Sequence, residues 1–100
     1  MAAVHAPAGI QAHPFTFTVR LDEDGYEGLE MDCSGEAAAI DAAREVLQTQ
    51  IDNRRRLAGT AHRGAVGVGI GSWIADPDKV VWLGEWEWTA ADGWYWQSSD

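Results

Sequence analysis

Apolar and polar residues alternate along several short stretches of this chain, and this period of two is the feature that most limits how it can fold. The clearest stretch is residues 15–21, FTFTVRL, in which every second residue is apolar. Successive side chains of a β-strand point to opposite faces of a sheet, so the alternation predicts a strand with one buried face. A similar run at residues 26–33, YEGLEMDC, predicts a second strand.

The segment between these two runs predicts a hairpin of defined register. A three-residue loop at residues 23–25, with Gly25 in the left-handed conformation, puts the apolar residues of both strands on one face. A loop one residue longer or shorter would set phenylalanine against carboxylate. The expected pairs are Phe15 with Cys33, Phe17 with Met31, and Val19 with Leu29.

Residues 35–59 have the period of an amphipathic helix. The residues expected to face the core are Ile40, Ala43, Leu47 and Ile51. We expect Ser34 to cap the start of this helix and Gly59 to end it. At 1.5 Å per residue, about twenty residues span roughly 30 Å, which is enough to cross a sheet.

Three further strands are expected after the helix, at residues 66–74, 80–89 and 94–98, the last two joined by a three-residue loop at 91–93. The element order is therefore β-β-α-β-β-β. It predicts an α+β fold in which a mostly antiparallel sheet of about five strands packs one long helix on one face. Residues 1–13 show no period, so we expect a flexible N-terminal arm followed by a single domain at residues 14–100.

Five of the six tryptophans lie in residues 80–100. One face of the expected strand at 80–89 consists of Trp82, Trp86 and Trp88, and the other carries Glu85 and Glu87. A preceding loop of odd length puts the tryptophans on the aliphatic face of the strand before, whereas an even loop buries the glutamates, which is costly. The odd loop makes the tryptophans the floor of the core beneath the alanine-rich helix, and an exposed aromatic platform is the alternative.

The chain has sixteen acidic and seven basic residues, a formal charge of −9. This charge repels nucleic acid and anionic membranes and attracts cationic surfaces, so we expect a basic protein partner and no direct nucleic-acid or membrane binding. No stretch approaches the roughly 18 consecutive apolar residues of a membrane span. The single cysteine and the lack of an export signal predict a cytoplasmic protein.

No motif in the chain predicts catalysis, a metal or a cofactor. The acidic run at residues 22–32 lacks the spacing of a calcium-binding loop, and GVGIG at 67–71 is not a phosphate-binding loop. Cys33 is expected on the inward face of its strand, where a thiol is inert. We therefore expect a protein that is not an enzyme.

Surface acids remain as the candidate binding residues. Those expected on the outward face of the sheet are Glu30, Asp32, Glu85 and Glu87. Those expected at the hairpin tip are Asp22, Glu23, Asp24 and Glu27. Such a surface can compete with a nucleic-acid backbone for a basic groove, and the alternative is an acidic surface that is only solvated.

In size, charge and lack of a catalytic motif, the chain is similar to phage-encoded inhibitors such as anti-CRISPR proteins. The likeness is one of class, and no residue is carried over from those proteins. It implies a non-catalytic acidic module that mimics nucleic acid and inhibits a basic nucleic-acid-binding protein. The alternative is a structural homo-oligomer, such as a homodimer, that assembles through strand edges or an aromatic sheet face.

Overall fold

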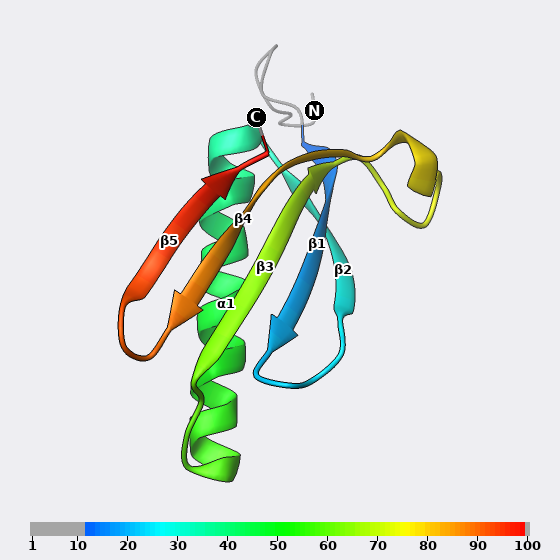
Figure 1. Cartoon of the computed structure of the whole chain (residues 1–100). Coiled ribbons are helices and arrows are strands. Elements are labelled where there is room, and N and C mark those ends of the chain that lie inside the picture. Colours follow the sequence, from blue (N-terminus) through cyan, green and yellow to red (C-terminus); the bar gives the residue numbers. More distant parts are fainter. Residues whose placement is uncertain (1–11, 100) are drawn as a thin grey trace, which may run out of the picture.

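The computed structural model describes residues 12–99. They form one five-stranded antiparallel sheet, in the order β2-β1-β3-β4-β5, and one long helix packed on one face of it (Figure 1). The elements are β1 (His13–Leu21), β2 (Glu27–Cys33), α1 (Glu36–Ala58), β3 (Arg63–Ile70), the 3-10 turn η1 (Pro77–Lys79), β4 (Val81–Thr89) and β5 (Gly93–Ser98). The expected α+β class and the order β-β-α-β-β-β are confirmed. The arm expected at residues 1–13 lies outside the described residues except at its last two positions, where His13 begins β1.

The helix packs on the sheet through a stripe that repeats every four residues. Its buried members are Ala39, Ala43, Leu47 and Ile51. The expected stripe is therefore right at three positions, whereas Ile40 is only half-buried. The N-cap is Gly35 without a side-chain bond, so the expected Ser34 cap is wrong, but Gly59 ends the helix in the left-handed conformation as expected.

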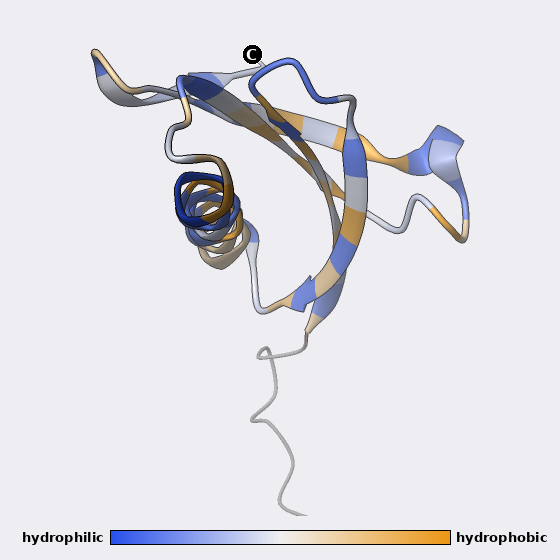
Figure 2. Ribbon diagram, turned by 90° about the horizontal axis from the view of Figure 1, so that it is seen from below, coloured by the Kyte–Doolittle hydropathy of each residue, from blue (hydrophilic) through white to orange (hydrophobic). Residues whose placement is uncertain are grey.

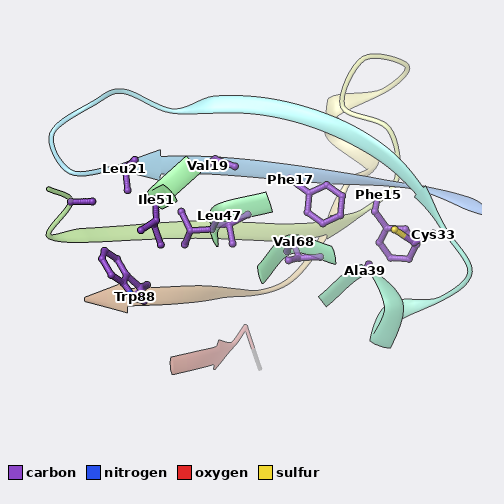
Figure 3. Close-up of a cluster of buried hydrophobic side chains, with 13 residues drawn as sticks. Phe15, Phe17, Val19, Leu21, Cys33, Ala39, Leu47, Ile51, Val68 and Trp88 are labelled. Atoms are coloured by element: carbon purple, nitrogen blue, oxygen red, sulfur yellow. The ribbon is translucent and has the colours of Figure 1, made fainter. Parts of the chain in front are cut away.

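The sheet curves around the helix, which lies on its concave side (Figure 2). Side chains of β1 and β3 meet those of α1 in the layer between them (Figure 3). The largest fully buried side chains are Phe17, Leu47, Ile51, Val66 and Val68. Folding removes the apolar surface of these side chains from water, and this is the main term that lowers the free energy of the folded state.

The first hairpin has the expected faces but a different register. Its loop spans residues 22–26, and Asp22 with φ 53° takes the left-handed position that was expected of Gly25. The observed pairs are Phe15 with Met31, Phe17 with Leu29, and Val19 with Glu27. The pairing differs from the expected one by two residues, and an even shift leaves every side chain on its predicted face.

The second hairpin shows the same kind of difference. Its loop is residues 90–92, and Gly93 with φ 83° already pairs with Thr89. Trp86 therefore pairs with Trp96 and Trp88 with Trp94, rather than the expected Trp88 with Trp96. The loop has the expected three residues but lies one position earlier.

A β-bulge in β4 divides the tryptophans between the two faces of the sheet. Val68 pairs with Gly84 but Gly69 pairs with Trp82, so Leu83 is an extra residue on the β4 side. The expected core-facing register is confirmed where Trp86 pairs with Val66, but it is wrong for Trp82, which the bulge turns to the face away from the helix. β3 also ends at Ile70 rather than at 74, so residues 71–80 form a long connection.

Four tryptophans line the helix side of β4 and β5: Trp86, Trp88, Trp94 and Trp96. Trp88 is buried, and the other three pack against the core. The Trp86 indole nitrogen donates to the carbonyl oxygen of Ile40 at 2.8 Å. The Arg44 guanidinium lies 5.5 Å from the Trp86 ring centroid and 5.1 Å from that of Trp94. The core position expected for the tryptophan cluster is thus confirmed for these four.

Candidate binding surface

The face of the sheet away from α1, here called the outer face, carries small and polar residues on its central strands. β1 contributes Thr16, Thr18 and Arg20, and β3 contributes Ala65, Gly67 and Gly69. The long connection at residues 71–80 projects beyond this face, on the side opposite the helix (Figure 2). The centre of the outer face therefore carries short side chains, and the connection at residues 71–80 projects at its border.

Gly67 and Gly69 of β3 have no side chain, and the indole ring of Trp82 lies across the space this leaves. A Cβ added at Gly69 would lie 3.0 Å from Cε3 of Trp82 and 2.5 Å from Cγ1 of Val80. A Cβ added at Gly67 would lie 3.7 Å from Cζ3 of Trp82 and 2.6 Å from Oγ1 of Thr18. A side chain at Gly69 would collide with Val80 and crowd the Trp82 ring, whereas at Gly67 it would collide with Thr18 and only touch the ring, so Gly69 is the residue that leaves room for Trp82 on the outer face.

An aromatic hollow of about 340 Å³ opens beside Trp82. Its residues are Thr16, Thr18, Tyr26, Gly28, Leu29, Glu30, Trp73, Ile74 and Trp82. The ring centroids of Trp73 and Trp82 are 6.5 Å apart and their planes are tilted by 51°. Tyr26, Trp73 and Trp82 are 72%, 52% and 39% exposed. Because exposed apolar patches of this kind often belong to interaction sites, the aromatic hollow is the candidate binding site of this face.

Two polar side chains hold the Trp73 wall of the aromatic hollow in place. Oε1 of Glu30 accepts hydrogen bonds from Ser72 Oγ at 2.7 Å and from the Ile74 backbone nitrogen at 2.8 Å. The buried Thr16 hydroxyl donates to the Gly71 carbonyl at 2.8 Å and accepts from the Trp73 nitrogen at 3.0 Å. The bonds from Ile74 and Ser72 hold the pKa of Glu30 below its ordinary value. Glu30 is therefore an ionised residue that positions the loop.

A pair of carboxyl groups lies on the outer face next to the aromatic hollow. Glu85 pairs with Gly67 and Glu87 with Ala65, so both face away from the helix as expected. A second hollow of about 620 Å³ joins Glu85 to Trp82 and Tyr26. Partial burial, and then the nearby Glu87, raise the pKa of Glu85 above its ordinary value. A carboxylate that is partly desolvated and repelled by its neighbour favours a cation beside it.

The acids of the hairpin tip have structural roles instead. Asp22 Oδ1 accepts from the backbone nitrogens of His62 at 2.8 Å and Arg63 at 3.1 Å, and Oδ2 lies 3.3 Å from the Arg54 guanidinium. Arg54 also forms an ion pair with Asp24. Burial alone would raise the pKa of Asp22, but the two backbone donors and Arg54 outweigh it and lower the pKa. Asp22 and Asp24 thus join the hairpin to the helix end.

The structure brings together only part of the predicted acidic surface. Glu30, Glu85 and Glu87 lie on the outer face around the hollows. Glu23, Glu27 and Asp32 are exposed. Glu27 is the first residue of β2 after the hairpin loop, and its pairing with Val19 puts it on the helix side of the sheet. Arg20 and Arg63 line a hollow next to Glu85 and Glu87, so this end of the face carries both signs of charge.

The sequence pattern did not predict the aromatic residues of this surface. Trp82 was expected in the core, because alternation of apolar and polar residues does not reveal a β-bulge. Trp73 was expected within a strand, but β3 ends at Ile70. The repeated glycine in GVGIG was the available signal, because small residues on one strand face leave room for a large ring from a neighbour.

Among residues 12–99, no group of three or more histidine, cysteine, aspartate or glutamate side chains is placed to hold a metal ion. Cys33 is buried as expected, and burial raises the pKa of its thiol, which keeps it in the unreactive protonated form.

The helix in the described part of the chain is too polar to cross a membrane. Comparison with protein-family models, curated proteins and solved structures found no match.

Proposed function

We propose that this chain is a non-catalytic protein-binding module whose outer face takes a basic segment of a partner protein. The observation that carries the proposal is the exposed aromatic hollow with a carboxyl pair beside it. Exposed aromatic side chains supply the apolar contact area that interfaces use as anchors, and carboxylates at the rim select the sign of the partner's charge.

Charge favours a basic protein as the partner. The chain carries −9 overall, and Glu85 is a carboxylate whose ionisation is opposed by burial and by Glu87. An arginine or lysine placed between these two carboxylates would relieve their repulsion. A nucleic acid would add phosphate charge to the same place, so direct nucleic-acid binding is disfavoured.

The resemblance to anti-CRISPR proteins suggests what such binding would do. A protein that occupies the basic groove of a nucleic-acid-binding protein competes with nucleic acid for it and acts as an inhibitor. Within this proposal the contact is centred on Glu85 and Glu87. The hairpin-tip acids Asp22 and Asp24 are paired with Arg54 and contribute less.

The proposal is tested by titrating the chain with a short arginine- and lysine-rich peptide at low and high salt. Replacing Glu85 and Glu87 together by lysine should weaken binding about tenfold or more, because it places like charges against the peptide. The matched control replaces Asp41 and Glu45, exposed on the helix, by lysine and changes the net charge equally. Equal loss in both double variants would show that only total charge matters and would contradict an outer-face site.

One observation favours a homodimer as the second candidate function. β5, with the sequence GWYWQS, ends the sheet and has neither a charged residue nor proline, whereas the opposite edge β2 carries Glu27, Glu30 and Asp32. Natural edge strands usually carry charge or proline to prevent pairing with a second chain. Among residues 12–99, β5 pairs with β4 alone, so its other edge is suited to antiparallel pairing with β5 of a second copy.

Light scattering after size-exclusion chromatography tests this second candidate. In a two-fold antiparallel pair, residues near the middle of β5 meet their counterparts, so replacing the exposed Tyr95 by lysine should produce a monomer. Replacing Tyr26, which is also exposed, by lysine is the control and should leave the dimer intact. A wild-type chain that is monomeric at micromolar concentration would eliminate the candidate.

A further inference from the structure

We infer that the aromatic hollow holds one cationic head group, an alkylammonium or a guanidinium, against the rings of Trp73 and Trp82. The inference rests on the proposed function and deepens it, because it names the group of the basic partner that is recognised: the end of a single lysine or arginine side chain, methylated or not.

The arrangement of the rings fits a small cation. Trp73 and Trp82 are tilted by 51° with their centroids 6.5 Å apart, so they form two adjoining walls rather than a closed stack. Tyr26 lines the same hollow from the β1–β2 loop. A cation within about 6 Å of a ring centroid is attracted by the negative face of the ring. Three aromatic side chains from three separate segments therefore present ring surface to one space.

The charged group in this hollow has the complementary sign. Glu30 is the one carboxylate among the lining residues, and none of those residues is basic. Its hydrogen bonds to Ser72 and Ile74 both use Oε1 and fix the carboxylate at the wall. The same bonds lower its pKa, so it is ionised at neutral pH and can act as the counter-charge.

The rest of the molecule shows that this chain pairs its aromatic rings with cations. Arg44 lies over Trp86 and Trp94, as described above, and Arg55 lies 5.4 Å from the Trp88 ring centroid. On the outer side, Arg20 lies 5.7 Å from the Tyr26 centroid. Within residues 12–99, no arginine or lysine lies over Trp73 or Trp82. These two rings are available for a cation from another molecule.

The volume selects the size of the group. About 340 Å³ is near the lower end of the range for small-molecule sites and leaves no room for a folded element. It accommodates the end of one side chain, while the remainder of a basic segment can extend along the second hollow toward Glu85.

The test compares choline with 3,3-dimethylbutan-1-ol, which has nearly the same shape but no charge. Binding is followed by the tryptophan fluorescence of the whole chain. We expect choline to bind at least about tenfold more tightly, which corresponds to ~1.4 kcal/mol. Replacing Trp73 by leucine should remove most of this preference, whereas replacing Tyr95 by leucine, an exposed tyrosine outside the hollow, should leave it unchanged.

Each outcome has a separate meaning. Equal binding of choline and the neutral alcohol, or no binding of choline, would overturn the inference. If a basic peptide still bound to the outer face in either case, the proposed function would stand without the cation site. If choline bound with the expected preference but no basic peptide bound, the cation site would be supported and the protein partner would be wrong.

Discussion

The conformation of the first hairpin loop depends on contacts that Asp22 makes with residues distant in sequence. It is the first residue after β1, adopts the left-handed conformation, and bonds to the backbone at His62 and Arg63. Its other oxygen meets Arg54 near the end of α1. The first hairpin, the helix and the start of β3 are therefore joined at one carboxylate.

Replacing Asp22 by alanine should lower the free energy of unfolding by about 1–3 kcal/mol, because two backbone donors lose their acceptor. Replacement by asparagine should cost less, since its amide oxygen still accepts and its backbone tolerates the left-handed conformation. Urea denaturation followed by circular dichroism measures both. An alanine variant as stable as the wild type would contradict the structural role given to Asp22.

Glu85 should respond to pH in the opposite direction to Asp22 and Glu30. Its pKa is raised in the folded chain by burial and by Glu87, so protonation favours folding and ionisation opposes it. The pKa values of Asp22 and Glu30 are lowered, so the stability they contribute is present at neutral pH and is lost as the pH falls through their folded-state pKa values.

Replacing Glu85 by glutamine should therefore raise the free energy of unfolding at pH 7 by roughly 0.2–1 kcal/mol, the range for a relieved like-charge pair on a strand. The gain should shrink as the pH is lowered toward the raised pKa of Glu85, where the wild-type carboxyl also becomes neutral. Denaturation curves at several pH values measure it, with Glu23→Gln at the exposed loop as the control. A gain that is independent of pH would contradict the assigned cause.

At the scale of elements, alternation was sufficient to predict which face the strands of both hairpins bury, except in the part of β4 before its bulge. The faces of both hairpins are as expected because each shift in register is of two residues. The registers themselves depend on distant contacts and on local backbone conformation. The first loop is closed by His62 and Arg63, and the second by the left-handed Gly93.

The bulge in β4 was the element that alternation could not reveal. Gly84 has φ 156°, and a Cβ there would lie 2.3 Å from the carbonyl oxygen of Gln97, so glycine is required. One extra residue in a strand turns the side chains that precede it to the opposite face of the sheet. Trp82 therefore lies on the outer face and not in the core. In the sequence, the extra residue Leu83 is simply part of the apolar stretch VVWLG, so nothing distinguishes it from an ordinary strand residue.

Replacing Gly69 by alanine tests the seat of Trp82. The added methyl group collides with Val80 and the indole ring, so we expect a loss of about 1–3 kcal/mol in the free energy of unfolding and a change in tryptophan fluorescence. Gly25→Ala is the matched control, because a Cβ there has no neighbour within 4 Å. Equal stability of the two variants would show that Trp82 does not lie on β3.

At the scale of the whole molecule, the two faces of the sheet use aromatic residues differently. Tryptophans on the helix side pack against the core and carry arginines of the same chain, whereas those on the outer face are open. Of the candidate site, Glu30, Glu85 and Glu87 were correctly predicted on the outer face. Alternation alone did not place Tyr26, Trp73 and Trp82 on this face, because their positions depend on the loop lengths and the bulge.

We propose that the outer face of the sheet is the surface that binds a basic partner. The most direct test of this proposal is a nuclear magnetic resonance titration of the isotopically labelled chain with a short arginine- and lysine-rich peptide. The indole signals of Trp73 and Trp82 and the backbone amides of Thr18 and Glu85 should shift together and saturate, and the indole signal of Trp88 should stay unchanged. Shifts concentrated on α1, or shifts that never saturate, would contradict the claim.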